Sequence, residues 1–181
     1  LESGQGLVFL HHAIAGWPAW EEYAEIIGGR FLYVSDQLRG TSCPDSGYRH
    51  NVNHTLKVVG DHPITAELPA SFSMTDELYL SEIFDDSIEP LLTSDFDFKC
   101  ANFYSAGHAI NGRMFDNEGW QHENGSNIVA CVKNYSNSPI AYLQGGVDPE
   151  AYSNIHYRQL IENSIRWVSS KEAHHWARKR N

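Results

Sequence analysis

The stretch Gly6-Leu-Val-Phe-Leu-His-His-Ala13 decides the fold class of this chain of 181 residues. Four apolar residues in a row indicate a short buried strand, and a helix pattern follows soon after it. A strand followed by a helix is the repeating unit of α/β proteins, which bind ligands just beyond the carboxyl ends of their strands. We therefore expect an α/β fold with a ligand-binding crevice where the two histidines end this strand.

The two adjacent histidines are expected to have different roles. Side chains alternate along a strand, so His11 shares one face with Phe9, whereas His12 shares the other face with Leu10. On this reasoning only one of them lines the crevice. We expect His11 to be the functional one and give His12 a lesser part in binding.

The composition is that of a soluble globular protein with an acidic balance. Thirteen basic and 23 acidic residues give a formal net charge of −10. Binding to nucleic acid needs clustered Lys and Arg, so we expect no nucleic-acid partner. No apolar run approaches the roughly 20 residues of a membrane helix, so we expect no membrane contact. The length suits a single domain over residues 1–181.

Three widely spaced cysteines, Cys43, Cys100 and Cys131, form no C-x-x-C pair. They therefore indicate neither a cysteine zinc site nor a disulfide framework. Cys131 lies in an apolar strand pattern and is expected to be a buried hydrophobic residue. No cofactor is indicated.

Hydrophobic periodicity predicts the remaining elements. A helix begins near Pro18, turns Tyr23 and Ile27 to its apolar face, and ends at Gly28. Residues 94–127 are rich in Gly, Asn and Asp without a clear period, which indicates either a binding loop or a secondary-structure element that the pattern does not reveal. Further strands are predicted at 54–59, 77–83, 90–93, 128–132 and 140–143, and a last helix at 157–168.

Five segments, which together extend over residues 4 to 170, occur in an order that resembles the ThuA-like family, named for trehalose utilisation. They are Gly6–His12, Trp17–Gly29, Asp61–Thr65, Thr75–Tyr79, and Pro139–Asp148 with the final N-S-I-R-W helix. The resemblance implies a flavodoxin-like three-layer α/β sandwich with a mostly parallel sheet, related to class I glutamine amidotransferases. Because the family's usual chain is longer at the amino end, it also implies that strands and helices of this domain precede Leu1.

The same resemblance implies a set of catalytic residues. The family's histidine after the opening strand falls on His11, the histidine of its H-P pair on His62, and its D-E-L-Y motif on Asp76, Glu77 and Tyr79. We expect His11, Glu77, Asp76 and His62 to be catalytic. Asp76 and Glu77 are adjacent, so on a strand they face opposite ways and at most one of them reaches a shared site. Equally, Asp76 suits the cap of a turn.

Four further residues are expected to bind substrate: Trp17, His12, His54 and Tyr79. Trp17 precedes the helix and suits stacking against a sugar ring, and aromatic residues beside carboxylates suit a polar pocket. One departure from the family matters. Members carry Gly-His-Asp near the end of the last strand, where this chain has Val147 between Gly146 and Asp148.

The leading functional hypothesis is a sugar-processing protein that acts on a small glycoside or oxidised sugar by His/carboxylate acid–base chemistry. Its partner would be a small-molecule carbohydrate. The alternative is a non-catalytic carbohydrate-binding or interaction module, which Val147 favours. A weaker alternative is a metal-dependent hydrolase, although no H-E-x-x-H spacing occurs. A cysteine nucleophile is disfavoured because the opening strand ends in histidines. The compartment and any homo-oligomer stay open.

Overall fold

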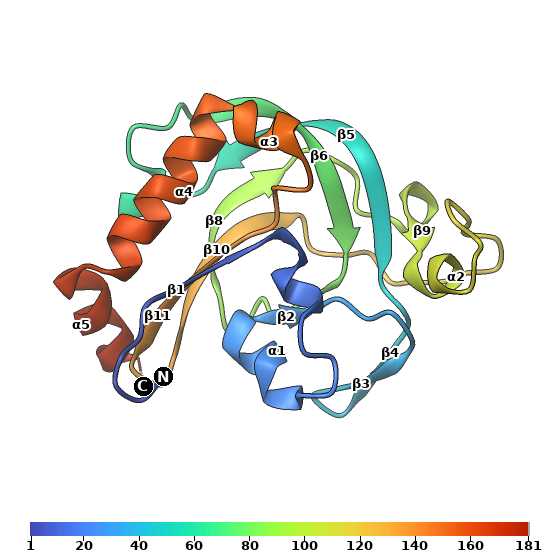
Figure 1. Cartoon of the computed structure of the whole chain (residues 1–181), viewed down its shortest axis with the longest axis horizontal. Coiled ribbons are helices and arrows are strands. Elements are labelled where there is room, and N and C mark those ends of the chain that lie inside the picture. Colours follow the sequence, from blue (N-terminus) through green and yellow to red (C-terminus); the bar gives the residue numbers. More distant parts are fainter. Residues whose placement is uncertain (181) are drawn as a thin grey trace.

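The computed structural model describes residues 1–180, which fold around a curved seven-stranded sheet (Figure 1). Six strands lie side by side in the order β1 (Leu7–Leu10), β11 (Ser138–Leu143), β10 (Ile128–Tyr135), β8 (Glu89–Ser94), β5 (Gly47–Val58) and β6 (Ser71–Leu80). A short strand, β9 (Tyr104–Ser105), also pairs with β5. Two small ladders complete the strands: β2 (Gly29–Arg30) with β7 (Glu82–Ile83), and β3 (Asp36–Leu38) with β4 (Thr41–Cys43).

The expectation of a mostly parallel, flavodoxin-like sheet is wrong for this part of the chain. Only β1 and β11 pair in parallel, and every other pairing described in the large sheet is antiparallel. Parallel neighbours need a long crossover, usually a helix, whereas β10 and β11 are joined by a tight turn at residues 136–137. The α/β class is confirmed, with a mixed sheet.

Helices cover both faces of this sheet (Figure 1). On one face lie α3 (Pro149–Ser153), α4 (Ile155–Val168) and α5 (Lys171–Lys179); on the other lie the 3-10 helix η1 (His11–Ala15) and α1 (Glu21–Ile27). The stretch 94–127, which lacks a sequence period, contains a 3-10 turn η3 (Cys100–Asn102), β9 and α2 (Ala106–Ile110). These elements are too short to produce a periodic signal.

Alternation along β6 separates the two faces. Met74, Asp76 and Leu78 face the helices α3 and α4, and the first and last of these belong to the larger hydrophobic core. Tyr79 belongs to the second core, beneath η1 and α1. Glu77, two residues earlier in the same strand, lies on the same side as Tyr79, and its carboxylate accepts a hydrogen bond from the Tyr79 hydroxyl. The expectation that Asp76 and Glu77 point in opposite directions is therefore confirmed.

Asp76 holds the loop that follows β11. Its carboxylate accepts hydrogen bonds from the backbone N–H groups of Gly146 (2.7 Å), Val147 (3.1 Å) and Glu77 (2.8 Å). Gly146 has a φ of +115°, a conformation that L residues rarely adopt. A Cβ atom on Gly145 would lie 2.9 Å from an Asp76 oxygen, so both glycines fit the loop closely around this carboxylate.

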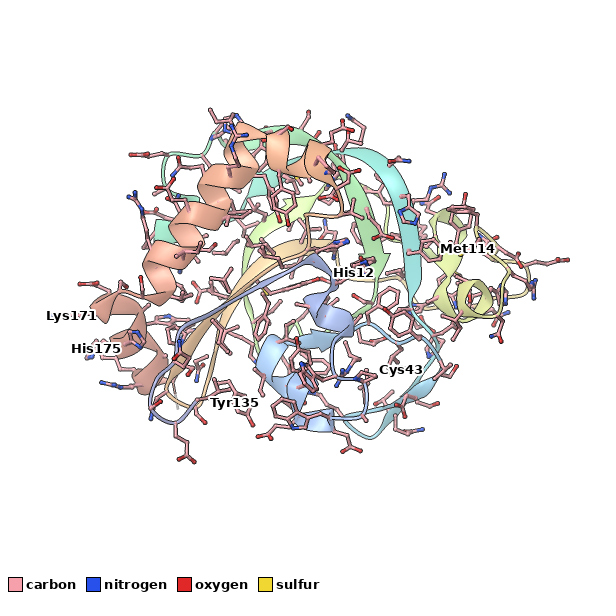
Figure 2. The ribbon with its side chains drawn as sticks, viewed as in Figure 1. His12, Cys43, Met114, Tyr135, Lys171 and His175 are labelled. Carbon is pink, nitrogen blue, oxygen red and sulfur yellow. The ribbon has the colours of Figure 1, made fainter. Side chains whose placement is uncertain are left out.

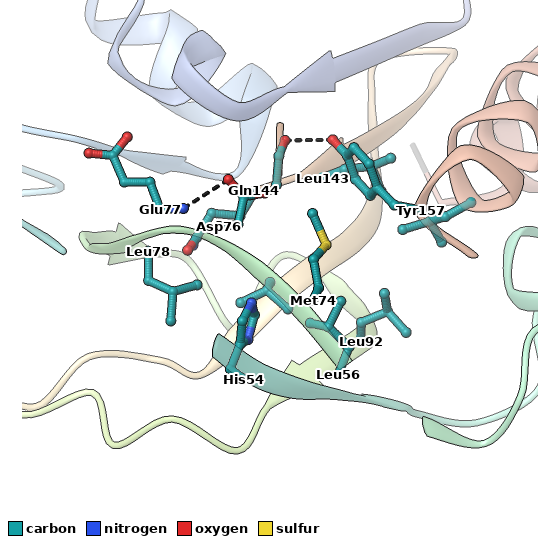
Figure 3. A pocket seen from close by; sticks show the side chains of 13 residues that line it. His54, Leu56, Met74, Asp76, Glu77, Leu78, Leu92, Leu143, Gln144 and Tyr157 are labelled. Carbon is teal, nitrogen blue, oxygen red and sulfur yellow. Dashed lines mark hydrogen bonds between the residues drawn. The ribbon is translucent and has the colours of Figure 1, made fainter. Parts of the chain in front are cut away.

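His54 lies on the same side of the sheet as Asp76. Its ring is buried, its Nδ1 lies 2.7 Å from the Ser94 hydroxyl, and no residue within 1–180 hydrogen-bonds its Nε2. Both residues line a small cavity of about 20 Å³, room for one water molecule, and the Glu77 carboxylate points away from it (Figure 3). Burial lowers the pKa of His54.

Replacing Asp76 with Ala should lower the free energy of unfolding by about 3 kcal/mol or more, because three backbone donors, two in the half-buried loop and one in β6, lose a charged acceptor. Asp148→Ala is the matched control: it removes the cap of α3 and should cost only about 1 kcal/mol. Urea denaturation of both variants measures the difference. Equal losses would mean that Asp76 does not hold the loop.

The lowered pKa of His54 predicts a loss of stability in mild acid. Below about pH 6.5 the unfolded chain takes up a proton that the buried ring resists, so the free energy of unfolding falls with pH until the folded pKa is reached. Between pH 7.5 and 5.5 the wild-type protein should therefore lose about 1 kcal/mol more than His54→Gln, which does not titrate. Parallel stability curves would contradict this assignment.

Candidate functional site

The chain reverses direction at His11, and this turn brings both adjacent histidines to one place. β1 ends at Leu10, and His11 begins η1 with a φ of +45°, which is uncommon for a residue other than glycine. The strand alternation predicted for this pair is therefore wrong. Both rings lie on the same side, with their centroids 4.3 Å apart, so His11 and His12 reach a shared partner.

That partner is the hydroxyl of Tyr79. Its oxygen lies 2.8 Å from His11 Nε2, 2.9 Å from His12 Nδ1 and 2.7 Å from Glu77 Oε2. Glu77 also lies 3.2 Å from His11 Nε2. We call these four residues the histidine–glutamate cluster. Within the cluster only His12 is exposed, and the other three side chains are buried.

The hydrogen bonds of the cluster fix where its protons lie. The Gln144 carbonyl, 2.9 Å from His11 Nδ1, can only accept, so Nδ1 carries a proton. Tyr79 has one proton, which it donates to Glu77. The remaining side of the phenol oxygen faces the two histidines as an acceptor. These hydrogen bonds join Glu77, Tyr79 and the two histidines into one network.

Burial and charge move the pKa values of the cluster in different directions. Burial favours neutral His11, but hydrogen bonds to Glu77 and to the Gln144 carbonyl outweigh it and raise the pKa of His11. Burial likewise opposes ionised Glu77, but its bonds from His11 and Tyr79 lower its pKa. Burial and the neighbouring charge of His11 lower the pKa of His12. Burial and Glu77 raise the pKa of Tyr79, which stays a phenol.

His50 joins the cluster from β5 and was not among the residues expected from the sequence. The pairing of β5 with β6 shifts between Arg49 and Val52, and Asn51 in this bulge has a φ of +54°. A bulge adds one residue to a strand and redirects its neighbours. His50 Nδ1 thereby comes to lie 3.4 Å from the second oxygen of Glu77, and its side chain stays 39% exposed.

Trp17 projects from the loop that follows η1 and is 70% exposed. The buried guanidinium of Arg30 holds this loop by donating to the carbonyls of Gly16 (2.8 Å), Trp17 (3.3 Å) and Trp20 (2.8 Å). The backbone of Trp17 has a φ of +50°. The stacking role expected of Trp17 stays a prediction.

Three of the predicted site residues lie apart from the cluster. His54 and Asp76 are on the opposite face of the sheet. His62 stands at the start of the 3-10 turn η2 (Pro63–Thr65), where its Nδ1 accepts from the Ile64 N–H at 3.1 Å and its ring packs on Trp167 of α4. Strand alternation separates His54 and Asp76 from the cluster, and the Asp-His-Pro turn directs His62 toward α4. The catalytic and binding roles expected for them stay predictions that this arrangement does not favour.

Donor atoms that suit a metal ion converge in the cluster. One atom each from His11, His12 and Glu77 lie within 4.8 Å of one another, and no other such group occurs among residues 1–180. Two histidines and one carboxylate are the ligands of many catalytic zinc and iron sites. His54 and His62 do not belong to this group of donor atoms, because His54 lies on the opposite face of the sheet and His62 packs on Trp167 of α4.

The cysteines lie away from the chemistry of the cluster. Cys131 is buried within β10, and burial raises its pKa to about 12, so its thiol is not a nucleophile. Cys43 and Cys100 line a surface groove beside Trp120. The prediction that Cys131 is a buried hydrophobic residue is confirmed.

No helix within residues 1–180 has the length and apolar character needed to cross a bilayer.

Comparison with known proteins shows the family to which the chain belongs. The family model described as ThuA, trehalose utilisation, matches residues 1–168. Putative ThuA-like proteins from Parabacteroides merdae (TM-score 0.63, 16% identity, 93% of this chain and 62% of that one) and Bacteroides uniformis (0.61, 21%, 94% and 61%) share its fold. The chain thus spans about three fifths of their length. No curated protein matches it. The chain belongs to the ThuA family of trehalose-utilisation proteins.

Proposed function

We propose that this protein processes a small glycoside or an oxidised sugar by proton transfer within the histidine–glutamate cluster. The observation that carries the proposal is the Tyr79 hydroxyl, which lies within 2.9 Å of two imidazoles and one carboxylate. General acid–base catalysis needs such groups within hydrogen-bonding reach of one another, on a rigid frame. Strand β6 and the turn at His11 supply that frame.

His12 is the residue proposed to meet the substrate, because it is the exposed member of the cluster. A proton taken from a sugar carbon or hydroxyl, or given to a glycosidic oxygen, passes through its imidazole. Tyr79 joins His12 to Glu77 and His11, which are buried and hold the balancing charges. General acid–base groups of this kind typically contribute a factor of about 10² to 10⁴ in rate.

Trp17 and His50 are proposed to place the sugar. The exposed indole of Trp17, in the loop after η1, offers an apolar plane, and the half-exposed imidazole of His50 offers a hydrogen bond beside Glu77. Sugar rings combine apolar faces with polar edges, so an aromatic plane next to polar groups suits them. The match to a family named for trehalose utilisation supports a carbohydrate as the ligand.

A non-catalytic carbohydrate-binding module is the second candidate, and Val147 favours it. Val147 is the apolar residue at the loop position where this chain departs from the Gly-His-Asp pattern. Its backbone N–H donates to Asp76. A protein that kept only the binding surface would hold sugar without changing it. Product formation separates the two candidates.

His12→Ala and Glu77→Gln should each lower turnover of trehalose or its keto derivative by about 100-fold or more, because each removes a group proposed to transfer or stabilise the proton. Release of glucose or its keto form, followed by chromatography, measures the rate. His175→Ala removes an exposed imidazole from α5, far from His12 (Figure 2), and should leave turnover unchanged. Full activity in His12→Ala would contradict the assignment. Binding without any product in the wild-type protein would establish the binding module instead.

A further inference from the structure

We propose that His11, His12 and Glu77 form a binding site for a divalent transition-metal ion of the Zn²⁺ class. The three side chains come from two segments 65 positions apart in the chain, the turn after β1 and strand β6, and they converge on a single point. This inference goes beyond the proposed sugar chemistry. It depends on the arrangement of donor atoms alone.

The spacing of the donor atoms suits a tetrahedral ion. Zn²⁺ binds nitrogen and oxygen ligands at about 2.0–2.1 Å, so its ligands stand about 3.3 Å apart. His11 Nε2 and Glu77 Oε2 are already 3.2 Å apart. All three donors lie within 4.8 Å of one another, so a small rotation of the exposed His12 ring completes the set.

Partners behind the donors hold them in the orientation that a metal requires. The Gln144 carbonyl accepts the Nδ1 proton of His11, which directs Nε2 toward the centre of the cluster. His50 contacts the Glu77 oxygen that faces away from His11, 3.4 Å from its Nδ1. Histidines that bind metals nearly always donate their other N–H to a carbonyl or carboxylate, which fixes the tautomer.

The Tyr79 hydroxyl marks the position of the proposed ion. Its oxygen lies 2.8, 2.9 and 2.7 Å from the three ligand residues, as a hydrogen-bonded group at the centre of a future coordination sphere would. An ion at this point would move the phenol oxygen aside. The exposed ring of His12 gives the ion a route from solvent.

The acidic balance of the chain also favours a cation. The net charge is −10, and Glu77 is the carboxylate at the centre of the cluster. A divalent ion bound by two neutral imidazoles and one carboxylate would leave one positive charge. When bound, it would supply a Lewis acid that polarises a sugar oxygen.

Metal binding is tested directly on the purified chain, stripped with a chelator and dialysed. Titration with Co²⁺ should give one intense visible absorption band at a stoichiometry of one, because a tetrahedral site of nitrogen and oxygen donors absorbs strongly. Zn²⁺ should displace Co²⁺ from the same site. His12→Ala and Glu77→Gln should each weaken Co²⁺ binding by more than about 100-fold, the size expected when a ligand itself is lost.

Two control variants separate this site from adventitious binding. His175→Ala should bind Co²⁺ as the wild type does, because that exposed imidazole on α5 lies far from His12 (Figure 2). Tyr79→Phe should keep the stoichiometry, because the phenol is not required for the three donors to meet. Weak binding that all variants share would overturn the proposal. Turnover that persists in chelator would leave the sugar chemistry standing without a metal, whereas tight Co²⁺ binding without turnover would leave the metal site standing alone.

Discussion

Three polar side chains share one phenol, and this arrangement organises the candidate site. The Tyr79 hydroxyl can satisfy His11, His12 and Glu77 only if the chain turns sharply at the end of β1. A straight strand would place the two imidazoles on opposite faces of the sheet. The positive φ at His11 is therefore the local cost of bringing them together, and the buried hydrogen bonds around Tyr79 offset it.

The sheet that carries the cluster divides the polar residues of the chain into two groups. On the face of η1 and α1, Glu77 and Tyr79 meet the histidines; on the face of α4, Asp76 holds the loop after β11. Through that loop the two faces are connected, because Gln144 stands at its start and its carbonyl fixes the His11 ring. The two adjacent carboxylates of the D-E-L-Y motif thus have different surroundings: Asp76 accepts hydrogen bonds from the loop after β11, whereas Glu77 contacts Tyr79 and His11.

Sequence patterns predicted part of this site for sound physical reasons. The apolar run before His11 identified the strand end, and alternation correctly separated Asp76 from Glu77. Alternation failed at His12, because it assumes a strand that continues. His50 escaped prediction because a β-bulge depends on the pairing of two strands and leaves no local pattern.

The sheet topology could likewise not be predicted from the sequence patterns. Apolar runs such as residues 128–132 and 140–143 suit buried strands of either orientation, and the turn between them decides that they are antiparallel. The family resemblance identified the α/β class correctly but implied a mostly parallel sheet, whereas among the described strands of the large sheet only β1 and β11 pair in parallel. Position along the chain also misled for His62, whose turn faces Trp167 and not the cluster.

The most direct test of this account is a ¹⁵N NMR spectrum of the histidine side chains in the wild-type protein and in Tyr79→Phe. Because one hydroxyl contacts both rings, its removal should shift the ring nitrogens of His11 and His12 together and leave those of His54 and His62 in place. A shift confined to one ring of the pair, or no shift at all, would contradict a shared phenol at the centre of the site.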